Sequence, residues 1–177
     1  MKKYIKFAMM ALCLSMGFVA CDVETDEEAG GTNVQNLAGH WEVTADLYDT
    51  AGNLLAADIM GGVFDLFTYN TSANDADSIW ITDAHNFWQF EMKIPCNVNT
   101  MTFSCPEKDY DAAGTGKAII TNGKVLLGAA KNLHGMPNDS ITFDITFSDD
   151  DADGDGTLDP YCYVYRLSGQ KYTGFYE

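Results

Sequence analysis

The chain has 177 residues, and its 26 acidic side chains outnumber the 10 basic ones, which gives a formal net charge of −16. So acidic a surface repels phosphate backbones, and nucleic acid is therefore excluded as a partner. Once the export segment and the tether described below are set aside, roughly 140 residues remain, which is the size of one domain.

The first 20 residues have the pattern of a bacterial secretory signal. Lys2, Lys3 and Lys6 give a positive start, and residues 7–20 carry no charge. A helix needs about 20 apolar residues to span a bilayer, so this run is too short for a transmembrane segment. The pattern predicts a signal peptide over residues 1–20 that is removed from the mature protein.

Cys21 follows Val19 and Ala20 directly. This segment resembles a bacterial lipoprotein signal, in which the cysteine after the cleavage site receives acyl chains. The resemblance implies lipidation of Cys21 and makes a membrane the partner of the protein through that acyl anchor. The alternative is a fully soluble secreted protein whose Cys21 is free or disulfide-bonded.

The residues after Cys21 combine charge with glycine. Asp22, Glu24 and residues 26–28 are acidic, and Gly30 and Gly31 follow. Such a segment cannot pack a core, which predicts a disordered acidic tether over residues 21–36 and a folded domain over residues 37–177. The tether resembles the acidic export tag of Bacteroidetes surface lipoproteins, which implies a lipid-anchored protein of the outer membrane at the cell surface.

The folded domain reads as a series of β-strands. Apolar residues alternate with polar ones in short runs, which is typical of half-buried strands, and the pair Asn122-Gly123 predicts a tight hairpin turn. Little helical periodicity interrupts these runs, so the sequence predicts an all-β fold, either an antiparallel sandwich or an up-and-down barrel of about eight strands. The strands are expected at residues 39–48, 63–70, 78–82, 86–94, 101–105, 117–121, 124–127, 140–148 and 161–168, with 171–176 as a possible extension of the last.

Gly39 and Trp41 on the first strand resemble the opening Gly-x-Trp motif of lipocalins. In that family the tryptophan packs near the closed end of the barrel and is covered by an arginine from the last strand. Arg166 is the only arginine of the chain and lies in the last predicted strand. The resemblance therefore implies a structural pair, with Arg166 covering Trp41.

A larger resemblance covers nearly the whole mature chain. The sequence is similar to a Bacteroidetes lipoprotein family named lipid-binding putative hydrolases, which has a lipocalin-like barrel. This resemblance implies a lipid-binding protein, or, as the family name suggests, a lipid or ester hydrolase. The stretches that carry it are residues 21–28, 39–43, 68–71, 86–90, 96–98 and 167–175.

Aromatic residues on the predicted strands are candidates for a binding site. An eight-stranded barrel is either filled by its own side chains or holds one small ligand. If it is hollow, we expect a small hydrophobic ligand or lipid to contact the following side chains: Phe67, Tyr69, Trp88, Phe90, Phe143 and Tyr163. If it is filled, the protein is instead a structural or adhesion module.

The loop before the last strand has the spacing of a calcium-binding motif. Carboxylates at alternate positions around a glycine-tightened turn converge on a hard cation, and Ca²⁺ is the cofactor that we expect. The expected ligands are Asp151, Asp153, Asp155, Thr157 and Asp159. Cys162 stands where an EF-hand loop has its bidentate glutamate, and the alternative is a solvated acidic loop.

Neither catalysis nor a disulfide has a strong sequence signal. There is no Gly-x-Ser-x-Gly motif, and Asp83 beside His85 is the one weak candidate for a catalytic pair. Cys96 and Cys105 flank a predicted turn, but they would lie about four residues apart along the strands, too far for a bridge. The pairing of Cys162 stays open.

Overall fold

The computed structural model describes residues 30–174, so the predicted signal peptide, Cys21 and most of the tether lie outside the described residues. The chain divides into two units, Met1–Gly31 and Thr32–Glu177, and the second contains the whole fold. In the described range no helix is long and apolar enough to cross a membrane.

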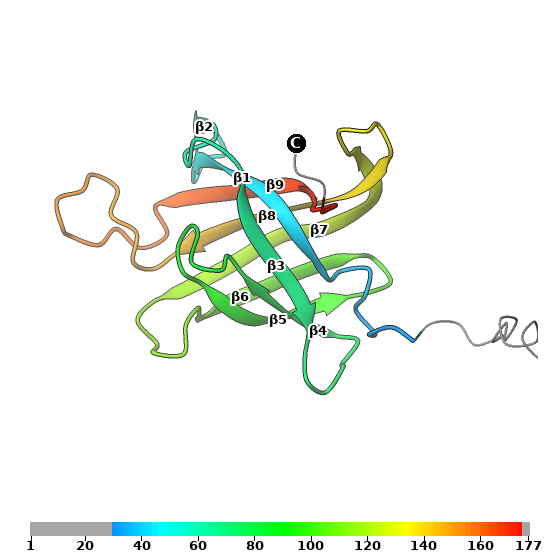
Figure 1. Cartoon of the computed structure of the whole chain (residues 1–177). Helices are drawn as coiled ribbons and strands as arrows, with labels where there is room; N and C mark the ends of the chain where they lie inside the picture. The colour runs from blue at the N-terminus through cyan, green and yellow to red at the C-terminus, as the bar shows by residue number, and fades with distance from the viewer. Residues whose placement is uncertain (1–29, 175–177) are drawn as a thin grey trace, which may run out of the picture. The chain divides into compact units, whose positions relative to one another are not determined.

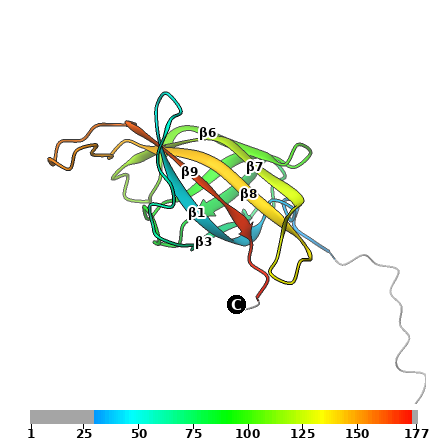
Figure 2. The same cartoon turned by 90° about the horizontal axis from the view of Figure 1, so that it is seen from above.

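Nine strands form one antiparallel sheet in the order β2-β1-β3-β4-β5-β6-β7-β8-β9 (Figures 1 and 2). An additional pairing of β1 with β9 closes the sheet, so that β1 and β3–β9 make an up-and-down barrel of eight strands, as predicted. The strands are β1 Gly39–Asp49, β2 Leu54–Ala56, β3 Phe64–Asn70, β4 Ser78–Thr82, β5 Glu91–Asn97, β6 Thr102–Asp109, β7 Lys117–Lys131, β8 Pro137–Phe147 and β9 Tyr163–Lys171.

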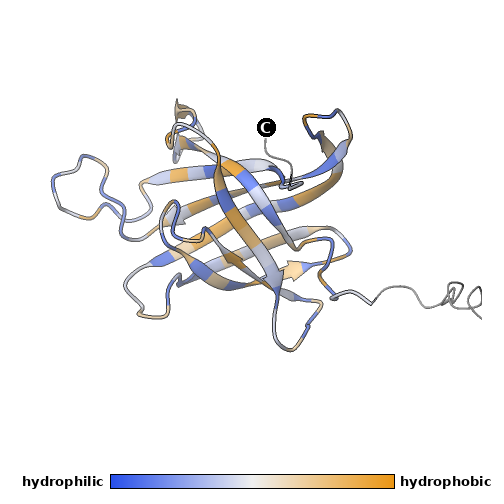
Figure 3. Ribbon diagram, in the orientation of Figure 1, coloured by the Kyte–Doolittle hydropathy of each residue, from blue (hydrophilic) through white to orange (hydrophobic). Residues whose placement is uncertain are grey.

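Period-two alternation places one face of each strand inside the barrel. On β8, Ile141, Phe143, Ile145 and Phe147 are all at most 1% exposed, and polar residues alternate with apolar ones along the strands (Figure 3). The interior side chains come from every barrel strand and pack into one continuous core. Close packing of this kind means that the middle of the barrel is filled by its own side chains.

One end of the barrel is closed by residues 33–37, which turn beneath the start of β1. Val34 and Leu37 are fully buried there, so the core includes a residue that the predicted tether contains. Trp41 donates from its indole nitrogen to Thr68 Oγ1 at 2.8 Å, and the Thr68 hydroxyl donates to the carbonyl of Leu37 at 2.7 Å. This chain of hydrogen bonds satisfies the buried polar atoms of the closed end.

The cation over Trp41 is Lys171, whose ammonium lies 5.5 Å from the ring centroid. The expectation that Arg166 covers Trp41 is wrong, because Arg166 points to the outer face of β9. There its guanidinium lies 4.5 Å from the ring centroid of Tyr48 and binds Asp144 at 2.7 Å. Period two explains the difference: Leu167 faces inward, so its neighbour Arg166 faces outward.

The predicted hairpin turn at Asn122-Gly123 is a β-bulge inside β7. The register shifts between Thr121 and Lys124, and Asn122 has a φ of 56°. A Cβ atom on Gly123 would lie 2.4 Å from the ring of Phe103, so only glycine fits beneath that ring. Asn122-Gly123 does favour a positive φ angle, but here that conformation accommodates an extra residue within one long strand and does not form a hairpin turn.

Residues 86–90 are the other segment predicted wrongly. We expected one strand over residues 86–94, but β5 begins at Glu91, and residues 84–90 form a turn-rich loop. Positive φ angles at Ala84, His85 and Gln89 bend the chain there. The alternation of Trp88, Phe90 and Met92 therefore comes from a loop followed by a strand.

Candidate functional site

Four connections gather at the end of the barrel opposite Trp41. Because neighbouring strands are antiparallel, the segments after β1, β4, β6 and β8 all lie at this end. We call this end the mouth. It consists of residues 50–63, 83–90, 110–116 and 148–162.

Asp83 holds the loop that crosses the mouth. Its side chain is fully buried, and Oδ2 accepts hydrogen bonds from the backbone amides of Phe87, Trp88 and Gln89 at 2.6–2.9 Å. Oδ1 accepts a further bond from the amide of His85 at 3.2 Å. Several amide donors around one carboxylate satisfy the buried charge and fix the backbone that carries Phe87 and Trp88.

Phe87 and Trp88 extend the core into an aromatic cluster at the mouth. Trp88 stacks on Phe147 with ring centroids 4.3 Å apart, and Phe87 stacks on Phe64 at 5.6 Å. Phe87 also meets the edge of Tyr165 at 5.4 Å. Phe64, Phe87 and Trp88 are only partly buried, so the cluster offers aromatic surface to a ligand.

Asp149 and the buried Asp150 border this aromatic cluster. Asp149 accepts hydrogen bonds from the Trp88 indole at 3.3 Å and from the Tyr110 hydroxyl at 2.7 Å. Burial, and then this bond to Asp149, raise the pKa of Tyr110 to about 12, so its hydroxyl stays a donor at neutral pH. Asp150 accepts from the buried hydroxyl of Tyr165 at 3.0 Å. The mouth therefore joins an apolar surface to an acidic rim.

The six aromatic residues predicted to contact a ligand occupy three different places. Phe90 and Phe143 lie inside the filled core, and Trp88 and Tyr163 pack against it at the mouth. Phe67 and Tyr69 lie on the outer face of β3, because Leu66 and Thr68 take the inward positions.

Both outer aromatic residues have partners on that face. Phe67 stacks on the ring of His40 at 4.5 Å. Tyr69 lies 6.3 Å from Trp80, and its hydroxyl donates to Glu91 at 2.7 Å. The structure thus brings together only part of the predicted ligand set.

Sequence reasoning missed the apolar surface of residues 54–63, which we call the apolar flap. Its large side chains are strongly exposed: Leu54 53%, Leu55 51%, Ile59 36%, Met60 45% and Val63 64%. The flap runs beside β1, where Ile59 donates its amide to the carbonyl of Ala45 at 2.8 Å. It leads directly into Phe64 of the aromatic cluster. The alternation of apolar and polar residues gives no signal here, because the segment is neither a buried strand nor a polar loop.

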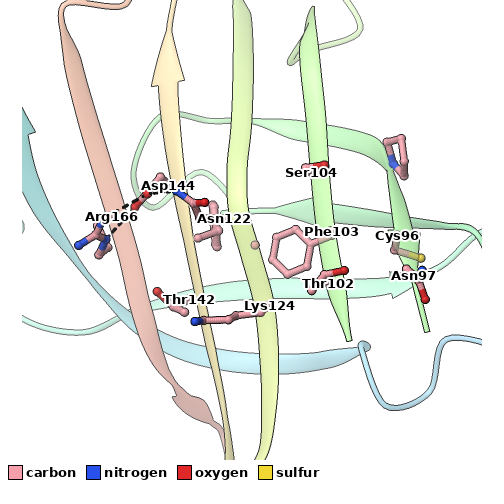
Figure 4. Close-up of a pocket in the computed structure, with 13 residues that line it drawn as sticks. Cys96, Asn97, Thr102, Phe103, Ser104, Asn122, Lys124, Thr142, Asp144 and Arg166 are labelled. Carbon is pink, nitrogen blue, oxygen red and sulfur yellow. Dashed lines mark hydrogen bonds and ion pairs between the residues drawn. The ribbon is translucent and has the colours of Figure 1, made fainter. Parts of the chain in front are cut away.

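A hollow lies outside the barrel, across β5–β9, and has a volume of about 800 Å³ (Figure 4). The exposed side chains of Thr102, Ser104 and Lys124 line it on the face opposite the core. Polar groups dominate this groove, whereas ligand pockets for apolar molecules are lined mostly by apolar side chains. The groove therefore suits an apolar ligand less well than the mouth does.

Asp144 lies at one side of this groove and is only 5% exposed. Arg166 donates to its two oxygens at 2.7 and 3.2 Å, and Asn122 donates to Oδ2 at 2.8 Å. Burial acts to raise the pKa of Asp144, but the hydrogen bonds from Arg166 and Asn122 outweigh it and hold the pKa below its usual value. The network ties β7, β8 and β9 together.

In the acidic loop, the carboxylates of Asp151, Asp153 and Asp159 each place an oxygen within 4.8 Å of the others. Asp155 instead accepts a hydrogen bond from the Thr157 amide at 2.7 Å, and its bonds with Thr157 lower its pKa. Three of the five predicted ligands thus converge, and Ca²⁺ binding by this loop stays a prediction.

We expect Ca²⁺ to raise the melting temperature of the protein, and the double change Asp153→Asn with Asp155→Asn to abolish that rise. A ligand at 100 times its Kd stabilises the native state by about 2.7 kcal/mol, which corresponds to several degrees. Thermal unfolding with Ca²⁺ and with a chelator measures the effect. Asp77→Asn, in the β3–β4 turn, is the control and should keep the full rise. An unchanged melting temperature in the parent protein would rule out the site.

The candidate catalytic pair of Asp83 and His85 is not formed as expected. Both oxygens of Asp83 accept backbone amides, including the amide of His85 itself. A different histidine, His40, lies 2.7 Å from Asp65, between the rings of Phe67 and Tyr172. The surroundings of His40 are thus aromatic rings on the outer face of the barrel.

Cys96, Cys105 and Cys162 are free thiols. Cys96 and Cys105 are not bridged, but the separation of about four residues on which that expectation rested is wrong. Cys96 pairs with Phe103 across the β5–β6 hairpin, so Cys105 lies two residues further along β6.

The family comparison covers the whole barrel. The family model described as lipid-binding putative hydrolase matches residues 26–176, from the tether to beyond β9. The chain belongs to the lipid-binding putative hydrolase family. This confirms the family resemblance expected from the sequence. Comparison with curated proteins gives no match.

In this member of the lipid-binding putative hydrolase family, the mouth is the barrel end where exposed apolar side chains lie beside partly buried aromatic rings. The mouth combines the apolar flap, the aromatic cluster and the acidic rim within one set of loops. The polar groove outside β5–β9 has a different chemical character.

Proposed function

We propose that this protein binds a lipid or another small hydrophobic ligand at the mouth, as a lipid-anchored protein of the cell surface. The observation that carries the proposal is the apolar flap: five large side chains exposed by 36–64% on one segment, directly before Phe64. Apolar surface concentrated in this way usually marks a binding site. The family description, which includes lipid binding, supports the same function.

The filled interior favours a ligand position outside the core. Trp41, Phe90, Phe143 and Phe147 are at most 1% exposed, and displacing any of them would cost the core its packing. A ligand that lies between the apolar flap and the ring pair Phe64–Phe87 would bury its own apolar surface without disturbing the packing of the core. Covering the flap side chains removes apolar surface from water at about 25 cal/mol per Å².

The charge at the mouth limits the ligand class. Asp149, Asp150 and the acidic loop lie at this end of the barrel, and the whole chain has a net charge of −16. An anionic headgroup would be repelled there. The proposed ligand is therefore apolar with a neutral or cationic polar group, such as a monoacylglycerol or a long-chain alcohol.

Binding of a neutral naphthylamine dye tests the position of the site. We expect Leu54→Ser with Met60→Ser to weaken the dye about 10- to 30-fold, because two half-exposed apolar contacts are worth about 1.4–2 kcal/mol together. The control is Leu133→Ser with Met136→Ser, at the other end of the barrel, which should bind as the parent does. Equal affinity in the parent and in both variants would contradict a site at the flap.

Tryptophan quenching gives a second measurement with the same protein. A brominated monoacylglycerol should quench Trp88 at the mouth, whereas Trp41 lies at the closed end and Trp80 on the outer face. Trp88→Phe should therefore remove most of the quenching. Quenching that survives in this variant would place the ligand elsewhere.

The anchor is proposed from the signal pattern before Cys21, which lies outside the described residues. We expect the protein from its own membranes to partition into detergent and Cys21→Ser to partition into buffer. A mature protein that begins at another residue would contradict the anchor. Turnover of the brominated ester by the purified barrel would instead favour the hydrolase that the family description names.

A further inference from the structure

The β7–β8 hairpin differs in charge from the rest of the molecule. Residues 112–138 contain Lys117, Lys124 and Lys131 but no Asp or Glu, in a chain with 26 acidic residues, and no other stretch of the chain without an acid is as long. The nearest acid on β8, Asp139, is paired with Lys171 at 3.7 Å. Lys117, at the mouth end of β7, is paired with Glu107, so Lys131 is the lysine nearest the turn of this acid-free segment.

The end of the hairpin extends beyond the core. Val125 on β7 and Ile141 on β8 are the last buried pair, and the two strands continue to Lys131 and Pro137. We call residues 126–138 the hairpin tip. Its large apolar side chains are Leu126 at 43%, Leu127 at 54%, Leu133 at 70% and Met136 at 62% exposure.

Hydrogen bonds within the hairpin hold the tip in a compact turn. The amide of Asn132 donates to the carbonyl of Met136 at 3.0 Å, and the Asn132 side chain accepts from the Met136 amide at 2.9 Å. The amide of Gly128, which has a φ of 65°, donates to Asp139 at 3.0 Å. Leucine and methionine are thus presented to solvent on a fixed turn.

The tip and the start of the barrel lie at the same end. Gln170 of β9 pairs with Glu42 of β1 on one side and with Ser140 of β8 on the other, so the beginnings of β1 and β8 lie at one level. Figures 1 and 2 both show the hairpin end and the entry of the chain toward the same end of the barrel, and Figure 1 separates the two across its width. The mouth, with its acidic loop, lies at the opposite end of the barrel.

We propose that the hairpin tip docks on an anionic lipid bilayer, with the leucine and methionine side chains in the interfacial layer and Lys131 at the headgroups. Exposed apolar side chains beside lysine are the composition of interfacial membrane-binding segments. Charge favours docking by the tip over docking by the mouth, because residues 126–138 carry Lys131 and no acid, whereas the acidic loop at the mouth is repelled by an anionic surface. This bilayer contact is separate from the proposed ligand site. With the tip docked, the ligand site faces away from the bilayer.

The chain length before the barrel is compatible with this orientation. Cys21 precedes Thr32 by 11 residues, which span at most about 40 Å when fully extended. An acyl group on Cys21, as proposed above, would therefore keep the closed end, and with it the hairpin tip, within reach of the same bilayer. The docking itself is driven by the tip and is tested without the anchor.

The test uses residues 32–177, since every core side chain lies between Val34 and Leu167 and this segment therefore carries the complete core. Co-flotation with vesicles of phosphatidylcholine alone and of phosphatidylcholine with phosphatidylglycerol measures binding. We expect stronger binding to the anionic vesicles, reduced by salt. Lys131→Gln should weaken that binding about fivefold, the effect of one lysine near an anionic surface.

Leu133→Ser with Met136→Ser should lower binding to both kinds of vesicle at least tenfold, whereas Leu54→Ser with Met60→Ser at the mouth should leave it unchanged. In dye binding the mouth pair should weaken the affinity and the tip pair should not. Failure of the ligand site and failure of bilayer docking are therefore distinguishable. In Leu133→Trp, brominated lipids should quench the new tryptophan. The melting temperatures of all variants show that they are folded.

Three outcomes would overturn the proposal. The first is no flotation with anionic vesicles, and the second is an equal loss in the tip and mouth variants. The third combines two measurements: sedimentation shows that the parent is a dimer and the tip variant a monomer, while the two proteins bind vesicles equally. The hairpin tip would then be covered by a second copy of this chain and not by a bilayer.

Discussion

Gly169→Ala should destabilise the barrel by at least about 3 kcal/mol and lower its melting temperature by roughly 10 °C. Gly169 lies on β9 opposite Val43, where β9 closes the sheet against β1. A Cβ atom there would lie 1.9 Å from the carbonyl oxygen of Glu42, which is backbone and cannot rotate away. The two closing strands would have to separate. Denaturant unfolding followed by far-ultraviolet circular dichroism measures the loss.

Ser168→Ala is the matched control, because Ser168 is the adjacent residue of β9 and faces outward. Its cost should be within about 0.5 kcal/mol, as for surface substitutions in general. If Gly169→Ala were as mild as Ser168→Ala, the close approach of β1 and β9 at this point would be wrong.

Phe143→Ala should cost about 3–5 kcal/mol, because it leaves a large cavity in the middle of the barrel. The Phe143 side chain is 1% exposed and packs at 5.7 Å from Phe103, beside the bulge at Gly123. The same measurement on Phe67→Ala is a control with the same residue type on the outer face, where we expect about 1 kcal/mol or less. A hollow barrel predicts the reverse: Phe143→Ala would then be well tolerated.

The strand pattern carries most of the information about this fold. Residues 78–82 were predicted as a strand and form β4 with the same bounds, and alternation on residues 140–148 identified the inward face of β8. A local rule suffices there, because a strand that is buried on one face shows period two whatever its neighbours are. The closed eight-stranded barrel follows from these strands and their short connections.

Local rules fail where two structures share one signal. Asn122-Gly123 favours positive φ both in a tight hairpin and in a bulge, and only the register with β6 and β8 distinguishes them. Residues 86–90 alternate like a strand, but the buried carboxylate of Asp83 turns them into a loop. Both cases depend on partners that are distant in the sequence.

The candidate site was less predictable than the fold. Alternation applied to β3 shows that Phe67 and Tyr69 share a face, but the choice of face depends on Leu66 and Thr68 packing inward. The apolar flap has no periodicity, and its exposure results from the way residues 54–63 run along β1 outside the core. The sequence therefore left open whether the aromatic residues line a pocket or fill the barrel, and in the structure the core is filled.

The position of β1 has a mechanical consequence. This first strand is paired along both edges, with nine residues opposite β9 and five opposite β3. A force applied along the axis of β1 would shear these interstrand bonds together and would not peel them off one after another. Because the load is shared in this way, a chain held by its N-terminal end resists extraction at forces that would unzip a terminal strand paired on one side only.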